Sequence, residues 1–498
     1  MRIAVMFLLI SINCNLSLFA QVFENFDKFF VDKTMRIDYF HIGDAKSEII
    51  TIDQIYMYGI WAGSRSHVID EFNVGRYYVK IYDKNSATLI YSKGFDSYFG
   101  EYQTSQAALD GIKKTYQESS LIPYPKGKII FALEKRNKEN KLEEFFRREI
   151  DPDDVNIRRD DLLDPSVMVF ESDKNGDPHT RVDVAIIAEG YTRLEREKLL
   201  DDLVYFQEVF FSHEPYKSNE SKFNFYGVFK PSAESGVDEP RAGLYKNTVL
   251  NCTFNSLGSE RYLLTEDNKS LRDIAANVPY DAIYIMVNHK RYGGGGIYNS
   301  FCTFTSDNQW KDYVFLHEFG HSFTGLADEY YTSSTAYNDF YKKNVEPVEA
   351  NITALLDPQN LKWKSFLTAG QEIPTPWEKA GYDTMDYRWQ KERRELNDKI
   401  AELKRNHEPM HVIIEAEQEY DLKDKLHSDK VDSYLRNSKY FGMVGAFEGA
   451  GYVSEGMYRP MIDCIMFSKG NKPFCKICES AIIKMINSYT EWKNINDF

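Results

Sequence analysis

Residues 311–330, KDYVFLHEFGHSFTGLADEY, contain an H-E-x-x-H motif, and the fold has to be built around this stretch. On a helix, His317 and His321 lie one turn apart on the same face, so both imidazoles can bind one metal ion. Glu318 projects beside that face, where its carboxylate can hold a water molecule and take a proton from it. The motif therefore predicts a hydrolytic metal site on a helix.

The residues around the motif predict a buried helix, after which the chain turns back toward the metal. Phenylalanines recur at every fourth position from Phe315 to Phe323 and give the helix an apolar flank. Gly325 permits a sharp turn where the helix ends. Asp328 and Glu329 follow, and the spacing favours Asp328 as third ligand with Glu329 as the alternative. Two histidines and one carboxylate leave a position open for water, as a catalytic zinc ion requires.

The composition is that of a globular protein with an acidic surface. Of 498 residues, 43% are hydrophobic and 28% are charged, which disfavours pervasive disorder and a multi-span membrane protein. At about 150 residues per domain, the length predicts two or three domains. The formal net charge of -15 repels phosphate backbones, so we expect no nucleic-acid partner.

The first 20 residues are typical of a secretory signal peptide. Met1 and Arg2 form a short positive region, residues 3–12 are almost wholly apolar, and cleavage is expected after Ala20. The apolar run is shorter than the roughly 20 residues that a membrane span needs. We therefore expect no stable membrane span and an exported protein, found in the periplasm, at the cell surface or outside the cell.

Export changes what the cysteines predict. Disulfides are the expected state in an oxidising compartment, and the odd number of cysteines after the signal peptide leaves one free thiol. Cys475 and Cys478 form a C-x-x-C pair, but the chain has no second such pair, which disfavours a four-thiolate zinc site. The cysteines outside the signal peptide are Cys252, Cys302, Cys464, Cys475 and Cys478.

Three regions differ in their sequence pattern. Residues 21–160 contain strand-like segments such as Tyr77–Tyr82 and Lys128–Leu133, which predict a β-sandwich accessory domain. Residues 161–498 mix strand and helix patterns, which predicts an α/β catalytic domain in a chain of overall α+β class. Within it, residues from about 385 to 440 predict an inserted helical hairpin, which serves either packing or contact with a partner.

Within the catalytic region the pattern predicts individual elements. We expect a helix over Thr192–Phe211 and strands at Val182–Ala188, Phe223–Phe229, Ala282–Val287 and Ile297–Phe304. A run of four glycines, Gly293–Gly296, precedes the last of these strands. A peptide substrate could pair with this edge, so Gly295, Gly296 and Ile297 are candidate substrate-binding residues, with a plain flexible turn as the alternative.

The stretch from His317 to Tyr330 resembles the zinc-site signature of the immunoglobulin-A peptidase family, which is metzincin-like. Similarity to family segments extends to Val182–Thr192, Tyr292–Asn299, Tyr458–Pro460 and Cys464–Met466. The resemblance covers nearly all of the chain after the signal peptide. It implies a secreted endopeptidase with one catalytic Zn²⁺, an N-terminal β-sandwich and a metzincin-like catalytic domain. It also implies a protein or peptide substrate, with immunoglobulins or glycosylated proteins as the class.

The resemblance also implies roles for particular residues. His317 and His321 match zinc ligands, Glu318 matches the general base, and Asp328 matches the third ligand. The usual metzincin pattern is H-E-x-x-H-x-x-G-x-x-H. Here one extra residue precedes the glycine, and an acid stands in place of the third histidine. This departure concerns the third ligand and leaves the metal site itself in place.

Two further residues lie near the C-terminal end of the similarity. Met466 resembles the methionine that packs beneath the zinc without binding it, and a core methionine is the alternative. Tyr458 is a candidate catalytic residue that could donate a hydrogen bond to the tetrahedral oxyanion, and core packing is the alternative for it.

Two other functions fit parts of the sequence. One is a non-catalytic surface protein that binds glycans or proteins and retains the zinc site. The other is a zinc amidase that cleaves cell-wall peptide cross-links. The intact Glu318 and both histidines favour the peptidase over the binding protein, and the acidic net charge disfavours an enzyme that acts on anionic cell-wall polymers.

Overall fold

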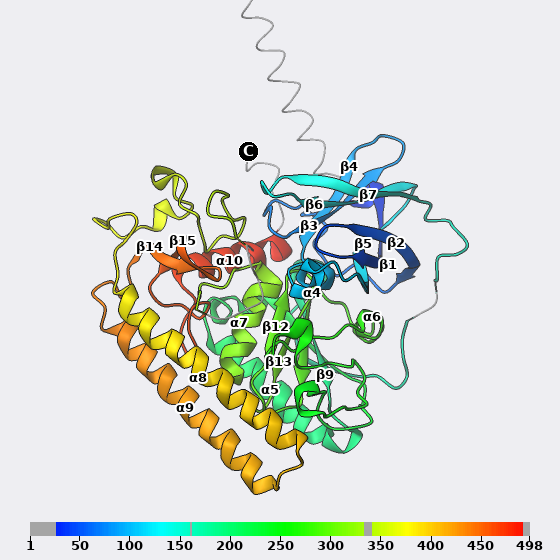
Figure 1. Ribbon diagram of the computed structural model, residues 1–498. Helices are drawn as coiled ribbons and strands as arrows, with labels where there is room; N and C mark the ends of the chain where they lie inside the picture. Colours follow the sequence, from blue (N-terminus) through cyan, green and yellow to red (C-terminus); the bar gives the residue numbers. More distant parts are fainter. Residues whose placement is uncertain (1–25, 160–161, 333–340, 492–498) are drawn as a thin grey trace, which may run out of the picture.

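The computed structural model describes residues 26–159, 162–332 and 341–491, so the expected signal peptide lies outside the described residues. The chain is of mixed α+β class. Figure 1 shows the sheets of the N-terminal region at the upper right and a pair of long helices at the lower left, with the helix that carries the H-E-x-x-H motif between them.

The N-terminal region contains two antiparallel sheets that share one hydrophobic core. Ile37, Ile81 and Phe131 lie fully buried in this core, one on each of three strands, and outward-facing residues alternate with the inward-facing ones. In strand order, the first sheet is β2 (Glu48–Tyr58), β1 (Phe30–Gly43), β5 (Lys114–Pro125), and the second is β4 (Leu89–Phe95), β3 (Tyr77–Asp83), β6 (Ile129–Arg136), β7 (Leu142–Ile150). The short helices of this region are α2 (Phe26–Phe29), α3 (Tyr98–Tyr102) and α4 (Gln106–Leu109).

A six-stranded mixed sheet forms the centre of the region that follows. Its middle strands run parallel, and an antiparallel strand closes each edge. All eight residues of β9 are buried, as expected for a central parallel strand with both faces covered. The order is β12 (Gly294–Ile297), β13 (Phe301–Thr305), β11 (Ala282–Val287), β9 (Val182–Glu189), β10 (Phe223–Phe229), β8 (Met168–Lys174).

Helices cover one face of this sheet. α5 (Arg196–Ser212) buries Leu199, Phe206 and Phe210 against it, and α7 (Lys311–Thr324) and α10 (Lys476–Thr490) share the same core. The amphipathic pattern of α5 follows the i, i+4 spacing of its apolar residues. A short 3-10 turn, Arg193–Glu195, precedes this helix, and a capping box between Thr192 and Glu195 stabilises that turn.

The N-terminal region covers the opposite face together with α6 (Asn268–Ala275). Phe99 and Tyr116 of the N-terminal region lie in one core with Ala185 and Ile187 of β9. The helices of the C-terminal region thus cover one face of the six-stranded sheet, and the N-terminal region completes the core on the other face.

The long helices form an antiparallel hairpin over the stretch in which a helical insertion is predicted. They are α8 (Lys379–Arg405) and α9 (Met410–Arg436), which begins after Pro409. Trp389 and Tyr420 pack between them. A two-stranded sheet, β14 (Val444–Ala450) and β15 (Val453–Met461), follows. Among the helices of the described residues, none combines the length and the apolar character needed to cross a bilayer.

The strand predicted at Ile297–Phe304 is wrong. The structure has two antiparallel strands there, β12 and β13, joined by a turn in which Asn299 adopts a positive φ of 53°. Of the two alternatives for the glycine run, a flexible turn does not hold for Gly294, Gly295 and Gly296, which belong to strand β12. The other three predicted strands match β9, β10 and β11 closely, because buried parallel strands have continuous apolar runs.

Candidate active site

Helix α7 places the H-E-x-x-H motif at the centre of the molecule. Phe315, Phe319 and Phe323 are buried on one side of it, and the ring of Phe319 stacks on those of Tyr284 and Phe323. The helix ends at Gly325, which adopts a left-handed conformation with φ 66°. Residues with a side chain rarely adopt this conformation, which explains why a glycine stands at the end of the helix.

The glycine run lets α7 lie directly against strand β12. A Cβ atom on Gly296 would come within 2.5 Å of the Glu318 carbonyl oxygen, and one on Gly294 within 2.6 Å of Val314. The glycines therefore serve close packing of the motif helix. A Cβ on Gly295 would instead meet Leu264 on the other side of the strand.

Of the three residues predicted to bind substrate, only Gly296 lines the cleft that contains the motif. Gly295 faces the other side of β12, and Ile297 is buried in the core on that side. The outer edge of β12 is already paired at Gly294, whose N–H donates to the Arg261 carbonyl and whose carbonyl accepts from the Leu263 N–H. This pairing restricts addition of a substrate strand to the remainder of the edge.

Three side chains converge at the base of the cleft. The Nε2 atoms of His317 and His321 lie 3.1 Å apart, and Asp328 Oδ1 lies 3.1 Å from the first and 3.2 Å from the second. No other described residue joins these three as a His, Cys, Asp or Glu ligand of the group. The structure thus brings together the three residues for which the sequence predicts metal binding.

Hydrogen bonds orient each of these ligands. His317 Nδ1 donates to the Ile465 carbonyl at 3.0 Å, and His321 Nδ1 donates to the Leu326 carbonyl at 2.6 Å. With Nδ1 protonated, each Nε2 presents its lone pair to the centre of the group. The Tyr452 hydroxyl donates to Asp328 Oδ2, which leaves Oδ1 for the metal.

The charges at the group are strongly coupled. Burial would lower the pKa of His321, but the Asp328 carboxylate more than offsets this and raises that pKa to about 9. Burial would raise the pKa of Asp328, and the two histidines instead hold it well below its ordinary value. Asp328 is therefore ionised throughout the physiological range and available as an anionic ligand.

The sequence left Asp328 and Glu329 open as alternatives, and the structure separates them. Asp328 points to the histidines, whereas Glu329 points away into a fully buried region. Successive side chains of an extended segment project to opposite sides, so only one of two neighbours can reach the histidines.

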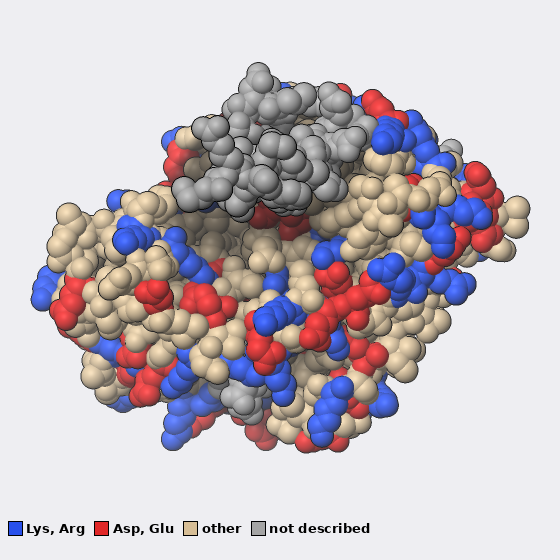
Figure 2. Space-filling view, turned by 90° about the horizontal axis from the view of Figure 1, so that it is seen from above, with Lys and Arg blue, Asp and Glu red and all other residues tan. Residues whose placement is uncertain are grey.

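The cleft above the group has a volume of about 820 Å³. Glu318 is half-buried in its wall, and burial raises the pKa of its carboxyl group while the neighbouring histidines lower it. Arg76 and Tyr77 of the N-terminal region line the cleft as well, so both regions of the chain form its walls. Beyond the cleft, Figure 2 shows Lys and Arg side chains interspersed with Asp and Glu over the face seen from above.

The structure places Met466 against the motif helix, whereas Tyr458 is not among the described residues that line the cleft. Met466 is fully buried beneath α7, where its sulfur would lie 3.0 Å from a Cβ on Gly320. Tyr458 is not among the described residues that line the cleft; it lies opposite Glu448 in the β14–β15 pair, with its backbone bound to Thr353. The structure therefore does not bring Tyr458 to the metal ligands.

Two cleft residues were missed by the sequence reasoning. Tyr452 contacts Asp328, six residues before the predicted Tyr458. The Arg261 guanidinium donates to the Tyr330 hydroxyl at 3.1 Å and lies over its ring, which places a positive charge in the cleft. Neither residue belongs to a recognisable motif, because each reaches the site from a distant segment.

The expected disulfides are absent from the described residues. Cys252, Cys302, Cys464, Cys475 and Cys478 are all buried free thiols, and Cys14 lies outside the described residues.

The arrangement of α7 and its ligands points to the metal-dependent hydrolases that carry H-E-x-x-H on a helix. Comparison with known protein families is more specific. The family described as IgA Peptidase M64 matches residues 170–486, and the family described as Peptidase M64 N-terminus matches residues 25–147. The chain belongs to the IgA peptidase M64 family, as its resemblance predicted. No curated protein matches the chain. Membership implies a metallopeptidase that acts on a protein or peptide substrate.

Proposed function

We propose that the protein is an exported zinc endopeptidase that hydrolyses extracellular proteins, with immunoglobulins or other glycoproteins as the substrate class. The observation that supports the metal site best is the convergence of two imidazole nitrogens and one carboxylate oxygen within 3.1–3.2 Å of one another at the base of the cleft. Family membership supports the peptidase activity.

The donor set suits zinc. Zn–N and Zn–O bonds of about 2.0–2.2 Å in tetrahedral geometry separate neighbouring ligand atoms by roughly 3.3–3.5 Å. The three observed separations lie just below this range, and the Nδ1 hydrogen bonds of His317 and His321 already set the required tautomer. When bound, zinc would polarise the scissile carbonyl and lower the pKa of water in the cleft.

Glu318 is the proposed general base. Its carboxylate accepts a proton from the attacking water and then donates it to the nitrogen of the leaving amine, so the base is restored after each cycle. Burial raises the pKa of this carboxyl group, which makes it a better proton acceptor than an exposed glutamate. Asp328 stays ionised because His317 and His321 lower its pKa, and it therefore holds its ligand position through the cycle.

The remaining parts of the chain fit this activity. We propose that residues 21–160 form a β-sandwich accessory domain, supported by two sheets with one core, and that residues 161–498 form a metzincin-like catalytic domain. Met466 beneath α7 supports the second assignment. Residues 1–20 would direct export as a signal peptide.

The test is an unbiased digest. The mature protein and its Glu318→Gln variant are incubated with a mixture of extracellular proteins that includes immunoglobulin A, and new termini are mapped by mass spectrometry. Glu318→Gln keeps the three metal ligands but removes the base, so cleavage should slow by about 10²–10⁴-fold. Glu208→Gln, on the exposed side of α5, is the matched control and should cleave like the unsubstituted protein.

The outcomes separate the possible functions. New termini produced by the unsubstituted protein and not by Glu318→Gln support the endopeptidase and give its cleavage preference. If both proteins leave every substrate intact while zinc is bound, the peptidase proposal fails and the non-catalytic binding function takes its place.

A further inference from the structure

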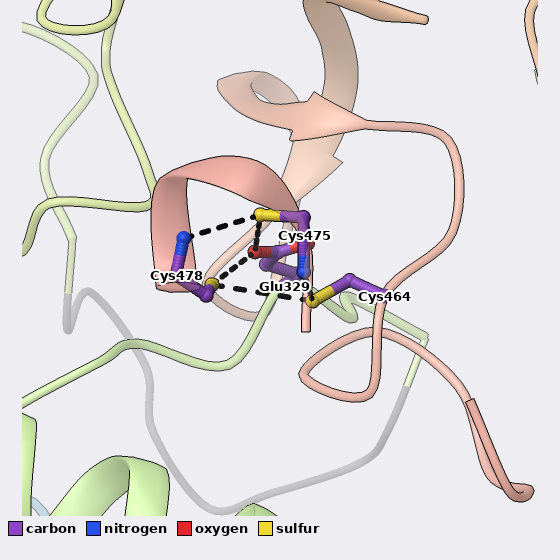
Figure 3. A group of neighbouring side chains, drawn as sticks. All are labelled: Glu329, Cys464, Cys475 and Cys478. Carbon is purple, nitrogen blue, oxygen red and sulfur yellow. Dashed lines mark hydrogen bonds between the residues drawn. The ribbon is translucent and has the colours of Figure 1, made fainter. Parts of the chain in front are cut away.

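A second group of potential metal ligands lies behind the first. Glu329, Cys464, Cys475 and Cys478 point toward one another in the interior, and none is more than 3% exposed. Figure 3 shows that they come from three separate segments, with Cys475 at the N-cap of α10 and Cys478 in its first turn. The peptidase mechanism uses none of these four side chains.

The distances within the group match the edges of a zinc tetrahedron. A Zn–S bond of about 2.3 Å places two sulfurs roughly 3.8 Å apart, and a Zn–O bond of about 2.1 Å places oxygen roughly 3.6 Å from sulfur. The Sγ atoms of Cys464 and Cys478 lie 4.0 Å apart. Glu329 Oε1 lies 3.7 Å from Cys475 Sγ and 3.3 Å from Cys478 Sγ.

The buried carboxylate of Glu329 is a further observation that points to a cation in this group. Glu329 is 0% exposed, and its Oε2 atom has no hydrogen-bond partner among the described residues. Its Oε1 atom accepts a hydrogen bond from Asn351 at 3.1 Å. A carboxylate in the interior is strongly unfavourable unless a cation or enough hydrogen bonds compensate for lost water. A bound cation supplies that compensation.

Backbone N–H groups already point at the sulfurs. The N–H groups of Cys475 and Met466 donate to Cys464 Sγ at 3.1 and 3.4 Å, and the Cys478 N–H donates to Cys475 Sγ at 3.4 Å. Such N–H···S contacts favour thiolates, which are the form that binds metal. These contacts would help to hold the sulfurs as thiolates once a metal is bound.

A disulfide explains this group less well. An S–S bond is about 2.05 Å long, so closing Cys464 onto Cys478 would need the sulfurs to approach by roughly 2 Å. Any single disulfide would also leave the third thiol and the Glu329 carboxylate buried side by side without a cation. All four ligand atoms lie within 4.8 Å of one another, which instead fits one shared metal ion between them.

We propose that Glu329, Cys464, Cys475 and Cys478 bind a second zinc ion with a structural role. Soft thiolates with one carboxylate select zinc over hard cations such as Ca²⁺ and Mg²⁺, and four protein ligands leave no open position for catalysis. This assignment goes beyond the proposed peptidase function and does not depend on it.

The position of the second zinc gives it a clear structural effect. Glu329 follows the catalytic ligand Asp328 directly, and its N–H donates to the Met466 carbonyl at 2.8 Å. The carbonyl of Ile465, next to Cys464, accepts the hydrogen bond that orients His317. One ion would thus link the segment of Asp328 and Glu329 to the segment of residues 464–466, and both segments position ligands of the first metal site.

Metal content separates the two sites. The full-length mature protein is purified without chelators, exposed to zinc, desalted and analysed by mass spectrometry of the metal. We expect about two zinc ions per chain, and about one in the His317→Ala/His321→Ala double variant, which lacks the catalytic ligands. Glu329→Gln should lose the second zinc or hold it more weakly. Cys252→Ser, which alters a buried cysteine outside the group, should keep both.

Cobalt identifies the ligands directly. Co²⁺ bound to the His317→Ala/His321→Ala variant should give an intense thiolate-to-cobalt charge-transfer band in the near ultraviolet, and adding Cys478→Ser should weaken it. The proposal is overturned if the double variant holds no zinc and shows no such band, or if peptide mapping finds a disulfide among the three cysteines in the metal-treated protein. Neither readout requires peptidase activity, so failure of the peptidase proposal would leave this test intact.

Discussion

Replacing Tyr452 by phenylalanine tests which tyrosine serves the catalytic site. The Tyr452 hydroxyl donates to Asp328 Oδ2, and Asp328 Oδ1 is the oxygen that lies 3.1 and 3.2 Å from the two histidine nitrogens. Loss of a hydrogen bond to a charged group corresponds to about 1.5–3 kcal/mol, because the carboxylate is left without its partner in a buried site. We therefore expect Tyr452→Phe to weaken zinc binding at this site by about 10–100-fold.

The assay has to report on the catalytic site alone. Peptidase activity is measured over a series of buffered free zinc concentrations, and the concentration that gives half-maximal activity is compared between variants. Tyr458→Phe is the matched control, because Tyr458 is not among the described residues that line the cleft, and it should behave like the unsubstituted protein. Activity at saturating zinc separates metal binding from turnover.

Two results would refute this reasoning. One is an unchanged zinc dependence in Tyr452→Phe, which would mean that the hydroxyl does not help to hold Asp328. The other is loss of turnover in Tyr458→Phe at saturating zinc, which would restore the role for Tyr458 that the resemblance implies.

Three further outcomes follow from the geometry. Gly296→Ala should lower the free energy of unfolding by about 1–3 kcal/mol, since the added Cβ meets the backbone of α7. The control is Gly127→Ala, whose added Cβ meets nothing within 4 Å. Thermal unfolding compares the two variants, and equal melting temperatures would contradict close packing at Gly296. Phe319→Ala should lower the free energy of unfolding by about 3–5 kcal/mol, because Phe319 is fully buried. Denaturant titration measures this loss, and Phe441→Ala, at a side chain that is 41% exposed, is the control. Burial would lower the pKa of His321, but the Asp328 carboxylate more than offsets this and raises that pKa to about 9, so zinc must displace its proton below that pH. The free zinc needed for half-maximal activity should therefore rise by up to about tenfold per unit as pH falls below about 9, and no change between about pH 6 and pH 8 would contradict this.

The sequence predicts the parts of the site that are local in the chain. The H-E-x-x-H spacing specifies two ligands and a base on one helix turn, and the left-handed conformation of Gly325 explains why a glycine ends that helix. The largely apolar and aromatic sequences of β10 and β11 specify those strands to the residue. For the glycine run, the sequence leaves a substrate-pairing edge and a flexible turn open, because a glycine that admits a neighbouring helix cannot be distinguished in sequence from either.

The parts that the sequence could not supply depend on distant segments. Tyr452 reaches Asp328 across 124 positions of the chain. The group of buried cysteines also depends on distant segments. The single C-x-x-C pair does not indicate that Cys464 and Glu329 lie beside it in a group of four. The spacing favours Asp328 over Glu329 as third ligand, and the fold shows in addition that each of these two side chains has a separate set of partners.

The shared core between the N-terminal region and β9 limits how this enzyme can be divided. Phe99 and Tyr116 cover Ala185 and Ile187, so a chain that began after residue 161 would expose an apolar sheet face to water. The N-terminal region also contributes Arg76 to the wall of the cleft. The wall of the cleft and the solubility of the sheet thus depend on both regions, and an engineer who transplants this site into another scaffold has to move both regions as a single unit.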